Sequence, residues 1–471
     1  MPLTSLTDDV AAQFRAALPD DRFRAPEAKY LEEPRGRFAG QAGLIATPHS
    51  TEDVARLIRL ASDLNVAVVP YGGGTGLVGG QVAEGALVPL VMSTERMTKV
   101  RAVYPQENVL IADAGVILAD VQAAAAEAGR LFPLSLAAEG SARIGGNLAT
   151  NAGGTGVLRY GNARDLCLGV EAVLPDGSIY HGLSRLRKDN TGYDLRHLLI
   201  GAEGTLGIIT AAALKLFARP SDRAVAMLAV ASPQAALSVL ECLRNHAGES
   251  VSAFELIHRQ GYDFLRDTLP DIRRPWDDPP DWSILVELGM SHAGQGIQTL
   301  ETVFEETVNA GWVSDGMIAQ SEAQADAFWS VREHIPEANR RIGSVSSHDI
   351  SVPLGALPAF IEEGGRRISR LGAFRINCFG HVGDGNLHYN VFPMPGKSRA
   401  DHLAERDEIK RVVHDLTDEL GGSVSAEHGV GRLKVKDLER YGDPAKLAAM
   451  RAIKSALDPK GIMNPGAVLR A

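Results

Sequence analysis

Two histidines and a Glu-His pair near the C-terminal end of the chain are the residues best suited to chemistry. His381 and His388 lie in the stretch "FGHVGDGNLHYN", and Glu427 and His428 lie in "SVSAEHGVG". Imidazole and carboxylate side chains are ligands of zinc and similar divalent ions. Because two histidines seldom complete a metal site, the Glu-His pair is a source for the third ligand. The alternative from the residues alone is that these are hydrogen-bonded core histidines in tight turns.

A tight turn would bring the two histidines together. Asp384-Gly385 is a strong signal for a two-residue type I′ hairpin turn. With these residues at the turn, His381 is directly opposite His388, and their Cβ atoms are about 4.5–5.5 Å apart. The next pair on that face is Phe379 with Asn390, which places a polar amide beside the site. The spacing therefore predicts two imidazoles that bind one ion.

The composition limits the kind of protein that holds these residues. A chain of 471 residues, 45% hydrophobic and 23% charged, is long enough for two or three globular domains. Its net charge of −10 disfavours nucleic acid and anionic membrane surfaces as partners. The N-terminus is acidic where a targeting peptide is basic, no apolar run approaches a transmembrane segment, and the three separated cysteines form no disulfide framework. These features favour a reduced, cytoplasmic compartment.

The elements expected before the histidines alternate between helices and short strands. Ser50 and Asp53 have capping-box spacing ahead of an amphipathic helix, which is followed by a buried strand at 66–69. A glycine-dense loop then leads into a further strand at 87–92. A hairpin is expected around 175–177, and Pro220 marks a boundary to a second domain of α+β type.

The glycine-dense loop is not a nicotinamide-dinucleotide fingerprint. Gly74, Gly76 and Gly79 match the G-x-G-x-x-G spacing, but a Rossmann site needs a helix that begins at the last glycine. Here the loop continues into a strand that contains Pro89. The unhindered backbone amides of the loop are nevertheless suited to binding a diphosphate.

Five motifs in one order resemble those of the FAD-linked D-2-hydroxyacid dehydrogenases, flavoproteins of the vanillyl-alcohol-oxidase type. They are "PYGGGTGLVGG", "GSARIGGNLATNAGGTGVLRYGN", "KDNTGYDLRHLLIGAEGTLGIIT", "GHVGDGNLH" and "SAEHGVG". The resemblance implies an α+β fold with a two-subdomain FAD-binding domain, an antiparallel-sheet substrate (cap) domain and a C-terminal segment that returns to the flavin. The implied parts are an N-terminal helical segment at 1–37, the FAD-binding domain at 38–219, the cap domain at 220–425 and the C-terminal segment at 426–471.

The resemblance assigns a set of glycine-rich positions to FAD. The diphosphate would lie on a loop that contains Pro70, Gly72, Gly73, Gly74, Thr75, Gly76, Leu77 and Gly79. The flavin would be lined by Gly140, Ser141, Gly145, Thr150, Asn151, Gly153, Gly154, Tyr160 and Gly161. The ribityl and adenine side would be approached by Glu203, Gly204, Gly207, Ile209 and, from the C-terminal segment, Asn464. Flavoproteins of this fold that attach FAD covalently through this loop have a histidine where this chain has Gly74, so FAD is expected to be non-covalent.

The resemblance also assigns the metal site and the base. It makes His381, His388 and Glu427 the ligands of a divalent metal, zinc first with manganese as the alternative, and it makes His428 the base. A 2-hydroxy acid chelates such an ion through its carboxylate and hydroxyl, and the ion lowers the pKa of the hydroxyl. His428 then accepts the proton while hydride passes from C2 to flavin N5.

Arg332, Asn390 and His428 are the residues expected to bind the substrate. Arg332 falls at the family's carboxylate-binding arginine, and a guanidinium fork suits that task; an arginine on a helix surface is the alternative. D-2-hydroxyglutarate is the favoured substrate, although the family's threonine and lysine for a distal carboxylate are replaced here by Pro336 and Ser347. The nearby candidates to replace the charge are Arg340, Arg341 and His348. D-lactate or another mono-carboxylate D-2-hydroxy acid is the alternative substrate.

Other functions and partners are also expectations at this stage. A flavin-free metallohydrolase and a flavoprotein subunit of a larger redox complex are the competing functions. The electron acceptor expected from the family is an electron-transfer flavoprotein, with a quinone as the alternative, whereas NAD is disfavoured by the missing fingerprint. A homodimer is the assembly common in the family.

Overall fold

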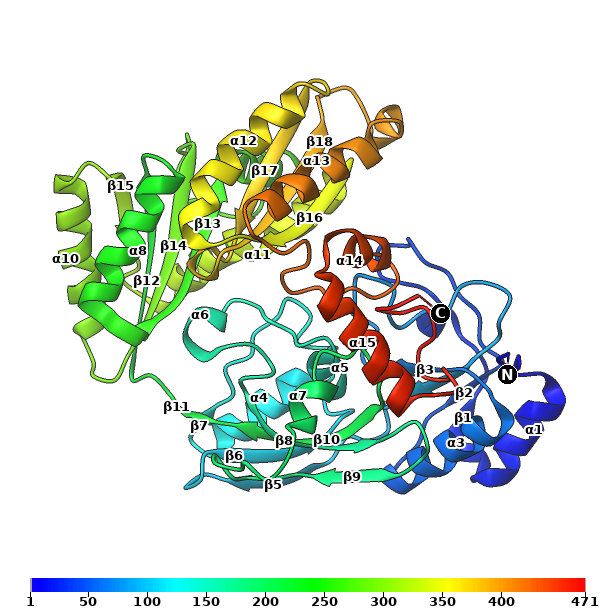
Figure 1. The fold of residues 1–471 in the computed structure, drawn as a ribbon. Helices are drawn as coiled ribbons and strands as arrows, with labels where there is room; N and C mark the ends of the chain where they lie inside the picture. The colour runs from blue at the N-terminus through cyan, green and yellow to red at the C-terminus, as the bar shows by residue number, and fades with distance from the viewer. Residues whose placement is uncertain (1, 471) are drawn as a thin grey trace. The chain divides into compact units, whose positions relative to one another are not determined.

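The computed structural model describes residues 2–470, which divide into two compact units (Figure 1). The first unit comprises Met1–Gly153, Gly161–Arg219 and Glu427–Ala471, and the second comprises Gly154–Tyr160 and Pro220–Ala426. Among the described residues, no helix is both long and apolar enough to cross a membrane.

Two main sheets form the frame of the first unit. The four-stranded sheet has the order β1-β2-β4-β3, with β2, β4 and β3 parallel and β1 antiparallel. The five-stranded sheet, β5-β6-β10-β8-β9, is antiparallel throughout, and β7 pairs separately with β11. The strands are β1 (Phe23–Arg24), β2 (Leu44–Ala46), β3 (Val68–Tyr71), β4 (Leu90–Ser93), β5 (Val100–Tyr104), β6 (Val109–Asp113), β7 (Arg130–Leu131), β8 (Cys167–Val173), β9 (Ile179–Gly182), β10 (Ile208–Lys215) and β11 (Phe217–Ala218).

Helix α3 shows how local sequence builds the first unit. The Ser50 hydroxyl accepts a hydrogen bond from the Asp53 amide, as the capping-box spacing predicts, and the apolar face of the helix is buried in the core beside β2, β3 and β4. The predicted hairpin is also confirmed, because β8 and β9 pair across Pro175–Gly177. The helices of this unit are α1 (Asp8–Ala17), α2 (Ala28–Leu31), α3 (Thr51–Leu64), α4 (Leu118–Glu127), α5 (Ile144–Ala149), α7 (Leu195–Leu199), α14 (Val435–Tyr441) and α15 (Pro444–Leu457).

No helix lies between β3 and β4 in the described chain, so the glycine-dense loop runs from strand to strand. A pyrophosphate on this loop would therefore meet backbone amides and no helix dipole. The structure agrees with the prediction that this is not a Rossmann site.

One seven-stranded antiparallel sheet forms the middle of the second unit, with the order β15-β12-β14-β13-β17-β18-β16. Its strands are β12 (Asp222–Val230), β13 (Val251–His258), β14 (Trp282–Met290), β15 (Val313–Ile318), β16 (Ser346–Ser351), β17 (Phe374–Gly380) and β18 (Asn386–Pro393). The helices are α6 (Val157–Tyr160), α8 (Pro233–Ala247), α9 (Arg259–Thr268), α10 (Gln295–Asn309), α11 (Glu322–Ile342), α12 (Leu357–Ser369) and α13 (Arg406–Glu419).

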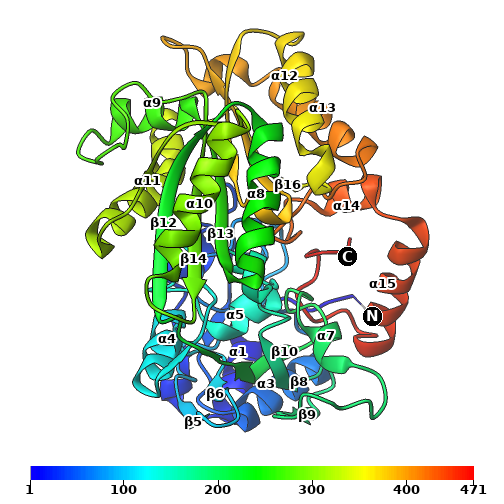
Figure 2. The ribbon, with the colours of Figure 1, turned by 90° about the vertical axis from the view of Figure 1, so that its left-hand side faces the viewer.

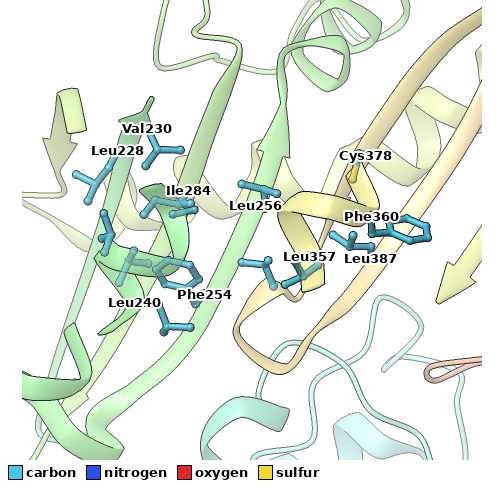
Figure 3. Packing of buried hydrophobic residues seen from close by; sticks show 14 of the residues in the cluster. Leu228, Val230, Leu240, Phe254, Leu256, Ile284, Leu357, Phe360, Cys378 and Leu387 are labelled. Atoms are coloured by element: carbon cyan, nitrogen blue, oxygen red, sulfur yellow. The ribbon is translucent and has the colours of Figure 1, made fainter. Parts of the chain in front are cut away.

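Helices cover both faces of this sheet. Residues of α8, α10, α12 and α13 pack in one apolar cluster with Phe254, Leu256 and Leu387 from the strands (Figure 3). Residues of α9 and α11 form a second cluster with Phe379 and Phe392. Because successive strand residues point to opposite faces, β13 sends Phe254 and Leu256 to the first face and Glu255 to the second.

The segment 154–160 is assigned differently by sequence and structure. The sequence analysis includes it in the FAD-binding domain, whereas in the structure it belongs to the second unit. Leu158 packs on the apolar cluster that contains Phe254, and the Arg159 guanidinium donates to the Ser252 hydroxyl and the Gly289 carbonyl at 3.0 and 2.7 Å. These are contacts between distant parts of the chain, and no local pattern reveals them.

Candidate active site

The hairpin that carries the two predicted metal histidines has a longer connection between its strands than the predicted two-residue turn. In β17 and β18 the residue opposite His388 is Phe379, and Asn377 is opposite Asn390. The predicted direct pairing of His381 with His388, and of Phe379 with Asn390, is therefore wrong. Strand β17 ends at Gly380, and residues 381–385 form the connection, which contains a 3₁₀ turn at Val382–Asp384.

Tertiary packing explains the longer connection. Val382 is buried in the apolar cluster of the sheet, and the Gly385 carbonyl accepts a hydrogen bond from the Val352 amide at 3.1 Å. Gly380 and Gly385 have positive φ angles of 150° and 88°, and a Cβ atom on Gly385 would lie 2.4 Å from the Val352 carbonyl oxygen.

The two imidazoles still come together, although the strand pairing does not oppose them. The centres of the His381 and His388 rings are 5.5 Å apart, and the ring planes are 80° to each other. His381 Nδ1 is 2.5 Å from Glu255 Oε1, and His388 Nδ1 is 3.9 Å from Asp349 Oδ1. The contact of Glu255 with His381 Nδ1 is of the kind that orients metal-ligating histidines for coordination through Nε2, and Asp349 lies near Nδ1 of His388 beyond hydrogen-bond distance.

Glu255 connects His381 to Arg332. Arg332 Nε donates to Glu255 Oε2 at 2.6 Å, both side chains are buried, and the guanidinium carbon is 4.8 Å from the centre of the Phe379 ring. Burial alone would raise the pKa of Glu255, but Arg332 and His381 hold it at about 2. The carboxylate is therefore ionised across the neutral pH range.

The structure gives Arg332 a fixed position. Its Nε bond to Glu255 is the only side-chain hydrogen bond that it makes within residues 2–470. The terminal Nη groups are therefore left as donors, and their binding of a substrate carboxylate stays a prediction. The competing interpretation, an arginine on a helix surface, is wrong because the residue is only 5% exposed.

Two rows of side chains cross the sheet on this face. The first is Asp349, His388 and Phe379, and the second is Ser347, Asn390 and Asn377, each set in register across β16, β18 and β17. Asn377 Nδ2 donates to Asn339 Oδ1 of α11 at 2.9 Å, and within residues 2–470 the buried Asn377 Oδ1 accepts no hydrogen bond. Predicted Asn390 thus lies beside a buried amide, Asn377, that sequence analysis did not select.

The second row contains no cation. Ser347 exchanges a 2.7 Å hydrogen bond with Ser344, and Pro336 lies inside α11. Arg340 and Arg341 both pair with Glu337 and are exposed. His348 points to the other side of β16, where its ring lies 5.2 Å from that of His414. None of the three suggested replacements for the family's lysine lies in this row.

Glu427 and His428 begin the C-terminal part of the first unit. The Ala426 amide, immediately before them, donates to the Asp349 carbonyl at 3.3 Å. Asp349 pairs with His388 across the sheet. Glu427, the predicted third ligand, is the residue that follows Ala426 in the chain. Glu427 Oε1 and His428 Nε2 are 3.8 Å apart.

Two of the segments assigned to FAD pack against each other in the first unit. A Cβ atom on Gly73 would lie 2.2 Å from the Ser141 carbonyl oxygen, and one on Gly72 would lie 3.3 Å from Gly146 Cα. On Gly204 it would lie 2.6 Å from Pro70 Cγ. The predicted FAD positions belong to the first unit, apart from Gly154 and Tyr160 in the second. Close packing of these segments is by itself a reason for several of the glycines, because a side chain would not fit there. The surface that the glycines form consists of main-chain atoms.

Glu203 and Asn464 attach the C-terminal segment to the first unit. The Glu203 carboxylate accepts hydrogen bonds from the Val430 and Gly431 amides at 2.7 and 2.8 Å, and its burial raises its pKa. Asn464 Nδ2 donates to the carbonyls of Gly80 and Glu203, both at 2.9 Å. The predicted return of the C-terminal segment is therefore visible as contacts with the glycine-dense loop.

Arg432 was not selected from the sequence. Its guanidinium donates to the carbonyls of Gly79 and Gly80 and to Asn464 Oδ1, at 3.0–3.1 Å. Glu255 and Asp349 were also missed. A single acidic residue within the apolar run "VSAFELIH" was the available signal for Glu255.

Comparisons with known proteins agree with these observations. The family described as "FAD linked oxidases, C-terminal domain" matches residues 219–468, and "FAD binding domain" matches residues 42–182. D-2-hydroxyglutarate dehydrogenase, mitochondrial, of Danio rerio is 37% identical over 99% of this chain and 86% of its own length. D-2-hydroxyglutarate dehydrogenase of Xanthomonas citri pv. viticola is 36% identical over 98% and 97% of the two chains.

Solved structures share the fold. p-Cresol methylhydroxylase aligns with a TM-score of 0.77 at 16% identity, over 98% of this chain and 97% of the other. Alkyldihydroxyacetonephosphate synthase aligns with a TM-score of 0.72 at 18% identity, over 99% and 86%. The predicted α+β fold of vanillyl-alcohol-oxidase type, and FAD as its cofactor, are confirmed.

Proposed function

The chain belongs to the FAD-linked D-2-hydroxyacid dehydrogenase family, and from this premise we propose that its substrate is D-2-hydroxyglutarate, oxidised with the help of a divalent metal. The observation that supports the metal is the closeness of the two imidazoles, 5.5 Å between ring centres, with Glu255 on Nδ1 of His381 so that Nε2 is left for coordination. The names of the relatives support the substrate.

The residues present fit both groups. His381 and His388 with Glu427 would hold the metal, and two imidazoles with a carboxylate are ligands that suit zinc. The backbone-walled glycine loop would hold the FAD diphosphate non-covalently, because Gly74 offers no nucleophile for attachment. When bound, the metal supplies Lewis-acid assistance to the substrate hydroxyl, and FAD supplies the hydride acceptor.

The chain's own residues would position the substrate and move one proton. Arg332, fixed by Glu255, presents its Nη donors to a substrate carboxylate. Asn390 places an amide next to the histidines to orient the substrate. His428 Nε2 or Nδ1, as a neutral imidazole, accepts the hydroxyl proton. The ionised Glu255 holds the His381 ring in one orientation throughout.

The absence of a cation from the row Ser347–Asn390–Asn377 favours a second candidate substrate. D-lactate or another mono-carboxylate D-2-hydroxy acid needs no distal charge partner, and the neutral row matches it. We keep the dicarboxylate first because the relatives of similar length carry that name. An electron-transfer flavoprotein or a quinone is the proposed acceptor, and cytoplasmic location is part of the proposal.

Anaerobic reduction of the bound flavin tests the proposal. D-2-hydroxyglutarate should bleach the yellow protein, whereas its L-enantiomer should not, and D-lactate should require a higher concentration. Prior chelation should stop the bleaching and leave the flavin bound. Faster bleaching by D-lactate would transfer the assignment to the mono-carboxylate, and bleaching that survives metal removal would refute the metal's role.

A further inference from the structure

A second cluster of metal-ligand side chains lies on the surface of the second unit. Cys242 and His246 are four residues apart on α8, so they lie on one side of that helix. Glu306 lies on α10, which packs beside α8 (Figures 1 and 2). One ligand atom from each of the three residues lies within 4.8 Å of the other two.

We propose that Cys242, His246 and Glu306 form a zinc-binding site that bridges α8 and α10, with water completing the coordination. In a tetrahedral site with Zn–S of about 2.3 Å and Zn–N and Zn–O of about 2.0 Å, ligand atoms are about 3.3–3.5 Å apart. Cys242 Sγ is 3.4 Å from Glu306 Oε2, and His246 Nε2 is 3.0 Å from the same oxygen. Small side-chain rotations are enough to admit the ion.

The ligand set selects the kind of cation. A thiolate with an imidazole favours zinc and other borderline-soft ions, whereas magnesium and calcium prefer oxygen ligands. Solvent can reach the cluster, because the side chains of His246 and Glu306 are 34% and 53% exposed. An ion can therefore enter from solution, and a water molecule can occupy the remaining coordination position.

This cluster is separate from the candidate active site. Cys242 packs against the apolar cluster on the α8 and α10 side of the sheet. His388 lies on the α9 and α11 side, in the row that contains Phe379. Without an ion, Glu306 accepts hydrogen bonds from Cys242 and His246. The response of the cluster to a cation therefore distinguishes a metal site from a hydrogen-bonded cluster.

Zinc at this position would have two consequences. It would tie the two helices that cover one end of the sheet. It would also mask the most accessible thiol of the chain, because Cys167 and Cys378 are buried and Cys242 is partly exposed. The proposal therefore predicts a thiol whose reactivity depends on zinc.

Protection of Cys242 from alkylation tests the proposal in the full-length flavoprotein. The protein is stripped with a chelator, dialysed, and treated with excess iodoacetamide at alkaline pH, because burial and Glu306 raise the pKa of this thiol to about 11. Peptide mass spectrometry follows modification of Cys242. Zinc at about 100 times its Kd should slow the reaction about 100-fold, and magnesium should not slow it.

Variants identify the ligands. His246→Asn and Glu306→Gln each retain the thiol but should raise the zinc concentration for half-protection at least about tenfold. His292→Asn, an exposed histidine outside the cluster, should leave protection unchanged. Turnover of a hydroxy acid should be equal in all three variants. Equal alkylation with and without zinc in the wild-type protein, or full protection in both ligand variants, would overturn the proposal.

Discussion

The two faces of the seven-stranded sheet receive alternate residues of the same strands and serve different purposes. Toward α8, α10, α12 and α13, β13 and β18 contribute Phe254, Leu256, Leu387 and Tyr389 to one continuous apolar cluster. Toward α9 and α11, the same strands contribute Glu255, His388 and Asn390 among fewer apolar residues. A well-packed face thus supports a face on which buried charges are held in fixed positions, which is the condition for preorganised chemistry.

Charged residues on the chemical face contact one another. Glu255 faces both Arg332 and His381, and Asp349 accepts from Asn386 Nδ2 at 3.0 Å while facing His388. A buried charge without such partners would cost several kcal/mol, and His381 is held by a carboxylate, Glu255, that is itself held by Arg332. The comparison therefore predicts that substitutions on this face reduce activity more than stability. Substitutions on the apolar face should reduce stability more than activity.

The largest effect is expected for His388→Asn. Removal of this proposed metal ligand should lower kcat/KM about 1000-fold, because Lewis-acid assistance lowers the barrier by several kcal/mol. The control is its strand neighbour Tyr389→Phe, which changes the apolar face and removes a buried hydroxyl without a partner. The kcat/KM from steady-state kinetics and the metal content should both fall in His388→Asn and should both be unchanged in Tyr389→Phe. Equal losses in both variants would refute the division between faces.

Glu255→Gln is expected to have the next largest effect on turnover. The substitution keeps the shape but removes the charge that positions His381 and Arg332, so kcat/KM should fall about 10- to 100-fold. Loss of metal affinity, measured by titration, should accompany the kinetic loss. A variant with normal metal affinity and normal KM would show that Glu255 has no positioning role.

Leu256→Ala tests the apolar face at the adjacent position. Truncation of this fully buried side chain should lower the free energy of unfolding by about 2–5 kcal/mol. Because the side chain points away from the histidines, kcat/KM of the folded enzyme should change less than about twofold. Urea unfolding and kinetics on the same preparation provide both numbers, and a large kinetic loss at full folding would contradict this expectation.

Ser347→Lys sharpens the account of the substrate. A cation in the row with Asn390 and Asn377 should favour D-2-hydroxyglutarate over D-lactate by about tenfold in kcat/KM, because a charged hydrogen bond contributes about 1.5–3 kcal/mol. The uncharged Ser347→Gln is the control. No change in the ratio would place the distal substrate group outside this row.

The smallest effect concerns pH. The pKa of Glu255 is lowered from 4.5 to about 2, so its contribution to stability is complete above pH 4.5 and is lost as the pH falls toward 2. The difference in unfolding free energy between the wild-type protein and Glu255→Gln should therefore shrink across that interval. Urea titrations at several pH values measure it, and a constant difference would show that the folded-state pKa is not depressed.

Local patterns were sufficient for several elements of the fold. The cap formed by Ser50 and Asp53, the hairpin at Pro175–Gly177 and the strand-to-strand course of the glycine loop follow from neighbouring residues, and all three are found in the structure. Turns and helix caps depend on contacts between residues that are a few positions apart, so the local sequence is sufficient to predict them.

The register of the His381–His388 hairpin was predicted wrongly for the opposite reason. Asp384-Gly385 favours a two-residue turn locally, but in the structure Gly385 contacts Val352, a residue distant in the sequence, and the connection is longer. Val352 and Gly385 lie in connections that are far apart in the sequence, and their contact outweighs the preference of the turn. The same applies to segment 154–160, which joins the second unit through Leu158 and Arg159.

The sequence by itself determined which residue types are available for metal, flavin and substrate, because motif order and spacing record those directly. Only the tertiary structure decided that Glu255 lies between Arg332 and His381, that Asp349 faces His388, and that Ser347, Asn390 and Asn377 form one row. The reason is physical: a buried ionised or polar group is stabilised by partners that arrive from distant strands and helices. Such partners have no fixed separation along the chain.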